Sequence, residues 1–392
     1  MRLAIISTLG ALLVLGTNAQ DRTSEAGEAA IKDGVAECAP YSYPPVFAKI
    51  SSFPTIWQPA TIVPNDTNAQ AKWSSIMGNV PTNIPTKGTI TGDFSNFTPT
   101  YSPSDSDCWW TFHQCVTPKL AGLPMDIADV PEPNTLGYGF DDGPNCSHNA
   151  FYDYLMSQNQ KATMFFIGSN VLDWPLEAQR GVADGHEICV HTWSHRYMTA
   201  LKSEDAFAEL YYTIKLVTGV TPTCWRPPFG DVDDRIRAIA NGLGLRTIIW
   251  RFDSNDWKAN TGNITAADVD TNYQNLISTA KTGGFNEAGA IMLTHEINNF
   301  TMAEAIKFYP QLKDAFKYIV PVGVAMNKTQ PYVESNYTLP TFEQYISGMT
   351  TANGSTTGKS NQSNGVTKIS LFWSAGMATI VFGLAILCQA SI

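Results

Sequence analysis

The sequence predicts an α/β fold, a deformed (β/α) barrel with an irregular N-terminal extension and a C-terminal linker and tail. From Thr135 onward, short apolar runs alternate with stretches in which apolar residues recur every three or four positions. Five short motifs that carry reactive side chains sit at or just beyond the ends of these runs. Strand and helix in alternation favour a parallel sheet, and parallel barrels place their active sites at the carboxyl ends of the strands.

The apolar runs are interpreted as buried strands because they are short, rich in β-branched or aromatic residues, and bounded by glycine or polar residues. In chain order they are Leu136–Phe140, Ala162–Gly168, Glu187–Val190, Leu245–Phe252, Ala290–Leu293 and Tyr318–Ala325. The stretches with helical periodicity are Ser147–Gln158, Leu176–Ala183, Glu204–Leu216, Val232–Asn241, Val269–Thr282 and Met302–Lys317.

The N-terminal part of the chain precedes the predicted barrel. Residues 1–19 contain Arg2, an apolar run and small residues at Thr17 and Ala19, which is typical of a secretory signal peptide, with a short membrane anchor as the alternative. Residues 20–134 are rich in Pro, Thr, Ser and Asn and predict an irregular extension. We expect its tryptophans to pack against the barrel rather than to stack on sugars.

The C-terminal part predicts attachment to a membrane. Residues 328–360 are expected to form a Ser/Thr/Asn/Gly-rich linker, and residues 361–392 a glycosylphosphatidylinositol (GPI) propeptide, because the apolar run Ile369–Ile392 carries no charge and follows small polar residues. A spanning helix is the alternative. Secretion to the cell wall and the outer face of the plasma membrane is the expected location.

Composition agrees with a secretory route. Nine Asn-x-Ser/Thr sequons occur, and six cysteines precede the apolar tail. Three disulfides are possible, and we expect the pairs Cys108–Cys115 and Cys189–Cys224. The formal net charge of −10 argues against a nucleic-acid partner, whose phosphates require a basic surface.

Two motifs predict a metal site. His191 and His195 are four residues apart and can converge on one ion if the chain turns helically after the strand. Asp141 and Asp142 are adjacent, and the Gly143-Pro144 turn after them is expected to let both reach one pocket. One carboxylate would join the two imidazoles on the ion, and the other would act as a base. The similar pair Asp233-Asp234 is interpreted only as a helix cap.

The other motifs supply candidate groups around such a site. Arg226 is expected to hold a free Asp ionised through two parallel hydrogen bonds, with a structural ion pair as the alternative. The backbone N–H of Phe229, fixed by the two prolines before it, is a candidate oxyanion donor.

A candidate general acid stands in the last motif. His295 follows a strand, and Asp256 is the natural partner to keep it protonated. Trp257 and Leu293 would wall a small apolar pocket, and Asp253 is interpreted as a turn residue.

Together these motifs resemble those of the polysaccharide deacetylase (nodulation-type) homology domain, the fourth carbohydrate esterase family, over a catalytic domain at residues 135–327. The signal, sequons and tail resemble those of fungal cell-wall members that act on chitin. The resemblance implies that a divalent ion, zinc in the first place with Co²⁺ as the alternative, is held by three ligands: Asp142, His191 and His195.

The resemblance also implies a role for each remaining residue. Asp141 would accept a proton from water, His295 would protonate the leaving amine, Arg226 and Asp256 would tune this base and acid, and the Phe229 N–H would stabilise the oxyanion. Trp257 and Leu293 would hold the acetyl methyl group. Glu296 stands where the family commonly has Asp, a change that we expect to be tolerated.

The expected function is therefore hydrolysis of N-acetyl groups of chitin or chitin oligomers to chitosan and acetate, with cell wall glycans and a GPI-bearing membrane as partners. One alternative is an esterase that removes O-acetyl groups from another polysaccharide. The other is a non-catalytic protein that binds wall glycans.

Overall fold

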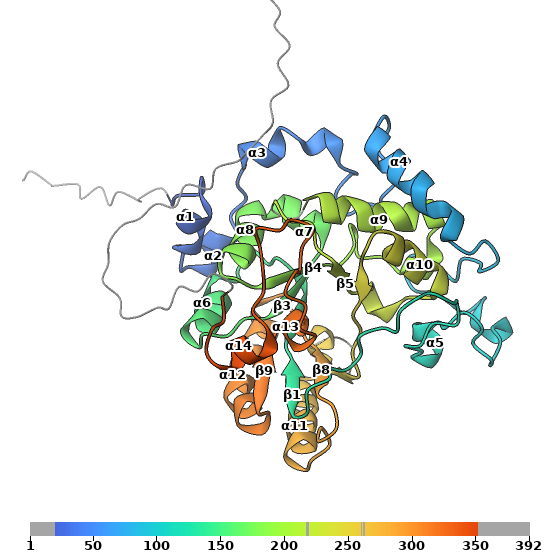
Figure 1. Ribbon diagram of the computed structural model, residues 1–392. Helices are drawn as coiled ribbons and strands as arrows, with labels where there is room; N and C mark the ends of the chain where they lie inside the picture. The colour runs from blue at the N-terminus through green and yellow to red at the C-terminus, as the bar shows by residue number, and fades with distance from the viewer. Residues whose placement is uncertain (1–19, 217–218, 260, 262, 352–392) are drawn as a thin grey trace, which may run out of the picture. The chain divides into compact units, whose positions relative to one another are not determined.

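A computed structural model of the protein describes residues 20–216, 219–259, 261 and 263–351 (Figure 1). The predicted signal peptide and GPI propeptide lie outside the described residues. The described part of the chain belongs to one compact unit.

All strand pairs in the described sheets are parallel. The sheet orders are β7-β8-β1-β9 and β2-β3-β4-β5-β6. The strands are β1 Thr135–Gly137, β2 Gly139–Gly143, β3 Thr163–Phe166, β4 Glu187–Val190, β5 Cys224–Trp225, β6 Arg246–Thr247, β7 Phe252–Asp253, β8 Ala290–Leu293 and β9 Tyr318–Val320.

Two runs of chain take part in both sheets and join them into a deformed barrel. The run β1–β2 pairs with β8 and β9 at its start and with β3 farther on, and Asp141 forms a parallel bridge with His295 beyond β8. The run β6–β7 pairs first with β5 and then with β8. The predicted parallel α/β fold is therefore confirmed, and all the strand ends that carry motifs lie at one rim.

Helices follow the strands as periodicity predicted, and α11 and α12 begin with capping boxes at Thr265 and Asn298. Those of the barrel are α6 Asn149–Ser157, α7 Gly168–Asp173, α8 Pro175–Ala183, α9 Ser203–Leu216, α10 Asp234–Gly242, α11 Ala266–Lys281, α12 Asn299–Ala315, α13 Val322–Ala325 and α14 Phe342–Ile346. Those of the extension are α1 Glu25–Ala29, α2 Gly34–Glu37, α3 Pro44–Phe47, α4 Thr67–Ile76 and α5 Trp110–His113. Single 3₁₀ turns are η1 Ile50–Ser52, η2 Met77–Asn79, η3 Thr98–Thr100, η4 Met198–Ala200, η5 Pro228–Gly230 and η6 Asp256–Lys258.

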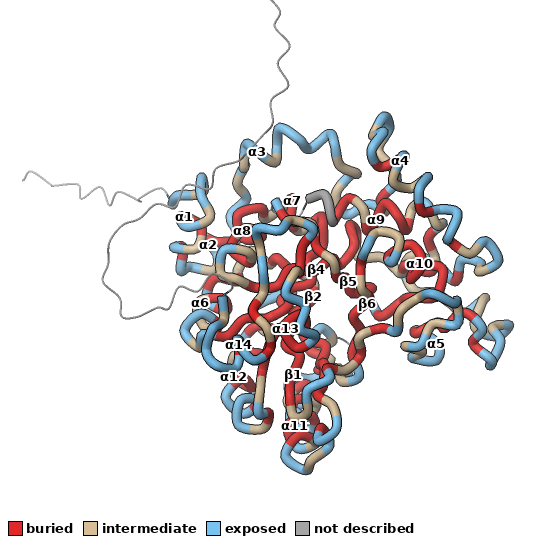
Figure 2. Tube along the Cα trace, viewed as in Figure 1, coloured by how far each residue is buried: buried red, intermediate tan, exposed pale blue. Residues whose placement is uncertain are grey.

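The strands are buried on both faces, as Figure 2 shows in red. In β3, Met164 and Phe166 belong to one hydrophobic cluster, and Phe165 between them belongs to the other. Successive side chains of a strand point to opposite faces, so this one strand contributes to both clusters. Burial on both faces explains why these strands are continuous apolar runs in the sequence.

Three predicted strands are wrong in extent. Leu136–Phe140 divides at Tyr138, and Leu245–Phe252 divides where Ile249 donates its N–H to Ile127 of the extension, 2.9 Å away. Tyr318–Ala325 is a strand only to Val320, because Pro321 has no N–H for the ladder and begins α13. The two-residue strand β5, which precedes Arg226, is absent from the prediction.

The extension is mostly irregular, as expected, but α4 is a ten-residue helix, capped by the Asp66 side chain. In Figure 1 it lies beside α9, with which it is in contact. Trp109 and Trp110 are buried, which confirms packing for these two tryptophans. The predicted disulfides Cys108–Cys115 and Cys189–Cys224 are present, and Cys38–Cys146 ties the extension to the barrel.

The chain beyond Asn327 continues as folded structure through residue 351, where a linker was expected. Tyr332 is buried, and its hydroxyl accepts a hydrogen bond of 3.0 Å from the Ile188 N–H of β4. Tyr345 of α14 is also buried and accepts from the Lys161 N–H at 2.9 Å. These tyrosines satisfy backbone donors at the base of two strands, so this segment belongs to the barrel.

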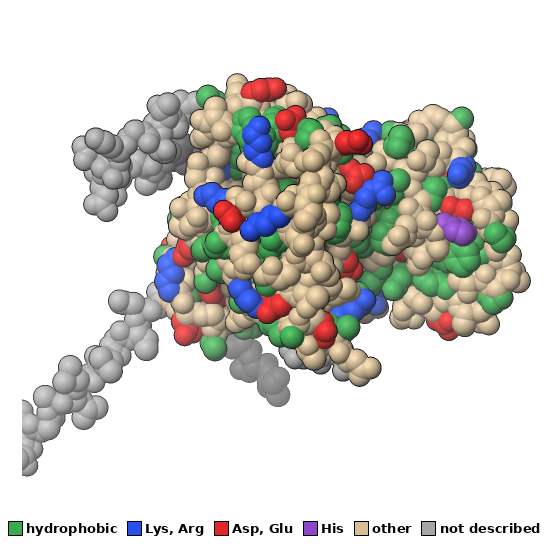
Figure 3. Space-filling model, turned by 90° about the horizontal axis from the view of Figure 1, so that it is seen from below, with side chains coloured by type: hydrophobic (Ala, Val, Ile, Leu, Met, Phe, Trp, Pro, Cys, Tyr) green, Lys and Arg blue, Asp and Glu red, His purple; other side chains and the backbone are tan. Residues whose placement is uncertain are grey.

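On the face seen in Figure 3, acidic and basic side chains are interspersed. Among the described residues, no helix combines the length and the hydropathy needed to cross a membrane.

We expect Tyr332→Phe to lower the free energy of unfolding by about 1–3 kcal/mol, because the buried Ile188 N–H loses its acceptor. Denaturant unfolding would measure the change. Tyr337→Phe, in the neighbouring ring 5.8 Å away, is the matched control. Equal stability of the two variants would contradict this role of the Tyr332 hydroxyl.

Candidate active site

The motifs converge on one cavity of about 630 Å³ at the carboxyl ends of the strands. Asp141 and Asp142 come from β2, and the other side chains come from the loops after β4, β5, β7 and β8. The cavity is lined by nearly every residue that the sequence selected: Asp141, Asp142, His191, His195, Phe229, Trp257, Leu293 and His295. The other two candidates, Arg226 and Asp256, are buried behind this lining and bind Asp141 and His295.

Three candidate ligands lie within reach of one ion. The Nε2 atoms of His191 and His195 lie 3.2 and 3.0 Å from the same oxygen, Oδ1 of Asp142. Ligand atoms of the three residues all lie within 4.8 Å of one another. Ligands of a tetrahedral zinc are separated by roughly 3.4 Å when each bond is about 2.1 Å.

The hydrogen bonding of this triad fits a cation. Nδ1 of His191 lies 2.8 Å from the Arg226 carbonyl oxygen, which can only accept, so Nδ1 carries the proton and the Nε2 lone pair of the neutral ring faces Asp142. Asp142 Oδ1 is buried and has no hydrogen-bond donor among the described residues. A carboxylate oxygen against a nitrogen lone pair is repulsive unless a positive charge lies between them.

The electrostatics of Asp142 favour its ligand form. Burial of its carboxyl opposes ionisation, but positive charge at the two imidazoles outweighs burial and holds the pKa of Asp142 well below its ordinary value. A bound cation would supply this positive charge when the rings are neutral. A carboxylate that stays ionised is ready to bind a cation.

The backbone at Asp142 directs the two adjacent carboxylates to different partners. Asp142 has φ 71°, in the left-handed region, and the register of β2 against β3 shifts between Asp141 and Gly143. Without this bulge, neighbours in a strand would point to opposite faces. The reorientation therefore occurs at Asp142 itself, which corrects our assignment of it to the Gly143-Pro144 turn.

Asp141 is held by Arg226 on the other side of the triad. Arg226 Nη1 donates to Asp141 Oδ1 at 2.6 Å, and both side chains are buried. This is the one bond in place of the two parallel bonds that we expected. The guanidinium also lies over the Phe165 ring, 3.9 Å from its centroid. Asp141 Oδ2 is left toward His191 Nε2, at 3.7 Å.

His295 and Asp256 form a second charge pair on the opposite side of the cavity. The Nδ1 of His295 lies 2.6 Å from Asp256 Oδ1, and the His295 N–H donates to the other carboxylate oxygen at 3.0 Å. Burial opposes protonation of the ring, but Asp256 outweighs it and raises the pKa of His295 to about 9. At neutral pH the imidazole is a charged proton donor.

Three further candidates form the walls. Phe229 lies in η5 with φ 59°, and its ring stacks on Tyr197, 4.1 Å between centroids. Trp257 in η6 is 40% exposed, whereas Leu293 at the end of β8 is 4% exposed. Asp253 ends β7 and accepts from the Asn255 N–H at 2.7 Å, but it also lines the cavity, so it is more than the turn residue that we expected.

Glu296 is buried behind the bulge. Its side chain occupies the space that a Cβ on Gly143 would need, so the glycine is required there. Burial, with the nearby charge of Asp142 next, raises the pKa of Glu296 to about 8. The residue is accommodated in the fold as a carboxyl that is mostly neutral at pH 7.

Sequence reasoning missed the contribution of the extension to this cavity. Trp110, Gln114 and Val116 line it together with Trp250. Buried Asp231 joins the extension to the motif loops, because it accepts from the Trp109 indole at 2.9 Å and from the Thr199 N–H at 2.7 Å. Nothing local in residues 105–120 signals these contacts, which are long-range.

The pair Asp233-Asp234 is more than the helix cap that we expected. Asp233 does cap α10 through the Ile236 N–H, but it also binds buried Lys87 of the extension at 2.5 Å. Asp234 accepts from the backbone N–H groups of Lys119 and Leu120, each at 2.7 Å. Both carboxylates therefore attach the extension to the barrel.

Comparison with known proteins finds the family model described as polysaccharide deacetylase at residues 129–248. The chain is 57% identical over 344 residues to chitin deacetylase 2 of Cryptococcus neoformans var. grubii, covering 86% of this chain and 75% of that protein. It is 45% identical over 291 residues to a chitin deacetylase of Amylomyces rouxii, with coverages of 72% and 68%. The solved chitin deacetylase of Colletotrichum lindemuthianum matches with a TM-score of 0.47 at 22% identity, covering 52% of this chain and 92% of that one.

We expect His195→Ala to weaken binding of a divalent ion by more than about 100-fold. Loss of a residue that only hydrogen-bonds to a metal ligand already lowers metal affinity by about 10- to 100-fold, and His195 is a candidate ligand itself. Elemental analysis after dialysis, followed by titration with Zn²⁺, would measure this. His113→Ala, which removes an imidazole outside the cavity, should leave the metal content unchanged. Full metal retention in His195→Ala would contradict the triad.

Proposed function

The chain belongs to the polysaccharide deacetylase family, and on this premise we propose that it hydrolyses the N-acetyl groups of chitin, releasing acetate and leaving chitosan. The observation that carries the proposal is the placement of an Asp/His/His triad between an Asp–Arg pair and a His–Asp pair around one cavity. Hydrolysis of an amide needs a base, an acid and a stabilised oxyanion, and this arrangement supplies a candidate for each.

We propose that Asp142, His191 and His195 hold the divalent ion, with zinc favoured by the mixed nitrogen and oxygen donors. When bound, such an ion supplies a Lewis acid that polarises the amide carbonyl and lowers the pKa of water. Three protein ligands leave positions open for water and substrate.

Asp141 is proposed as the general base that accepts the proton of the attacking water. Its Oδ1 is engaged by Arg226, and its Oδ2 is directed toward the triad, so the oxygen that can take the proton is the one nearest the reacting atoms. The buried guanidinium stabilises the carboxylate form until the proton arrives. The Phe229 N–H is proposed to donate to the developing oxyanion.

His295 is proposed as the general acid that protonates the leaving amine. Asp256 fixes the ring through Nδ1, which leaves Nε2 as the nitrogen that gives up its proton to the substrate. Leu293 and Trp257 are proposed to hold the acetyl methyl group, since both line the cavity beside His295 and offer apolar surface.

We further propose that the protein is secreted and anchored by GPI outside the plasma membrane, close to its wall substrate. The sequence pattern at both ends supports this. Three disulfides in the described chain agree with an oxidising compartment.

We expect Asp141→Asn to lower kcat for acetate release from chitin oligomers by about 100-fold or more, because the amide cannot accept the proton. The metal content should not change. Acetate release from acetylated xylan, measured in parallel, tests the O-acetyl esterase alternative. Retention of most of the activity in Asp141→Asn would rule out its role as base.

The activity should fall as pH rises through about 9, where His295 loses its proton. Asp256→Asn removes the negative charge that outweighs the effect of burial on His295, so the pKa of His295 falls. The basic limb of the kcat–pH profile should then move to lower pH by about one pH unit or more. Asp314→Asn, which alters an exposed carboxylate, serves as the control. An unmoved basic limb in Asp256→Asn would exclude His295 as the titrating acid.

A further inference from the structure

The cavity is larger than its chemistry needs. Its volume of about 630 Å³ lies in the range that holds a whole drug-sized molecule, well beyond one acetamide group. The candidate catalytic side chains and Phe229 account for part of the lining, and Trp110, Gln114 and Val116 of the extension add to it.

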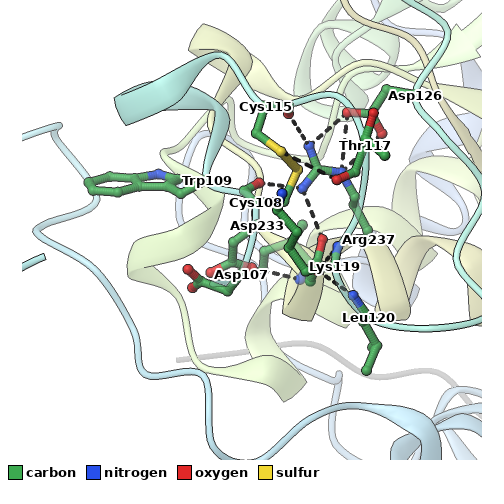
Figure 4. A network of polar contacts seen from close by, with 12 residues as sticks. Asp107, Cys108, Trp109, Cys115, Thr117, Lys119, Leu120, Asp126, Asp233 and Arg237 are labelled. Atoms are coloured by element: carbon green, nitrogen blue, oxygen red, sulfur yellow. Dashed lines mark hydrogen bonds and ion pairs between the residues drawn. A yellow bond between two sulfur atoms is a disulfide. The ribbon is translucent and has the colours of Figure 1, made fainter. Parts of the chain in front are cut away.

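This part of the lining, the wall formed by the extension, is held firmly by the barrel. The disulfide Cys108–Cys115 closes the loop, and Arg237 of α10 donates to the carbonyl oxygens of Cys108 and Cys115 at 2.6 and 2.9 Å. Figure 4 shows both bonds, together with the ion pair from Arg237 to Asp126. A loop fixed at both ends by one buried cation forms part of a prearranged binding surface.

Trp110 places the loop against the motif that carries Phe229. Its backbone N–H donates to the Val232 carbonyl oxygen at 3.0 Å, and the centroid of its indole ring lies 4.8 Å from that of Trp250. The indole fills the space beside Gly230, where a Cβ would collide with it. Displacement of this loop would therefore disturb the loop of the proposed oxyanion donor.

The exposed chemistry of the wall suits a sugar. Gln114, at the end of α5, is exposed and has a left-handed backbone with φ 50°. Its amide offers both a donor and an acceptor, as sugar hydroxyl and acetamido groups require, and Val116 and Trp110 supply apolar surface for the C–H face of a pyranose ring.

We propose that the loop 108–116 is a substrate subsite, in which Gln114 binds the N-acetylglucosamine unit next to the one that reacts. This inference rests on the proposed function. It assigns to the extension a share in substrate specificity, namely recognition of a chain rather than of an isolated acetamide.

The test compares Gln114→Ala with wild type on penta-N-acetylchitopentaose and on N-acetylglucosamine, which has no neighbouring unit to fill the subsite. Loss of one substrate hydrogen bond should lower kcat/KM for the pentamer by roughly three- to tenfold. The loss should appear in KM with kcat nearly unchanged, and the low activity on the monosaccharide should not change. His113→Ala, on the same helix but outside the cavity lining, should behave as wild type.

Binding of the pentamer, measured by calorimetry on Asp141→Asn with and without Gln114→Ala, gives a second readout that needs no turnover. Gln114→Asn guards against a folding defect, because Asn tolerates the left-handed backbone, and it should also weaken pentamer binding. Unchanged affinity and kcat/KM for the pentamer in Gln114→Ala, or an equal loss for the pentamer and the monosaccharide, would overturn the subsite. Absence of acetate release by the wild type would instead overturn the proposed function.

Discussion

Two acidic residues that are neighbours in the chain must serve different partners in one cavity, and the backbone at Asp142 makes this possible. The left-handed turn and the bulge send Asp142 to the two imidazoles while Asp141 stays with Arg226. A left-handed conformation at a residue other than glycine is costly, and it persists only where the surroundings enforce it. Here Glu296 packs against Gly143, and the Asp141 N–H is bonded to the Thr294 carbonyl at 2.9 Å.

Each of the two charge pairs at the cavity contains an aspartate, but one pair provides a proton acceptor and the other a proton donor. Asp141 lies beside a guanidinium, which cannot give up its proton at physiological pH, so the carboxylate is the group that can accept one. Asp256 lies beside an imidazole, which can give up its proton, so the ring is the group that can donate. In the proposed reaction, the basic partner therefore decides which aspartate accepts a proton and which one supports a proton donor.

The sequence was sufficient for the fold class and for the residues that meet at the cavity, because strand–helix alternation and short motifs are local patterns. It was insufficient where the outcome depends on distant partners. Cys224–Trp225 is too short to show periodicity, and the apolar run around Ile249 does not reveal that its partner changes from β5 to β8. Gln114 lies in a polar stretch without pattern, and only tertiary contacts bring it to the cavity.

The attachment of residues 105–126 to the barrel has a consequence for protein engineering. The segment that matches the family model begins at residue 129, yet Asp233, Asp234 and Arg237 within it have partners upstream of that point. Removal of the residues before 129 would leave these buried charges without partners, which costs several kcal/mol of stability for each uncompensated ion. The barrel therefore cannot be transferred to another protein by itself, and any chimera built from it has to include its N-terminal extension.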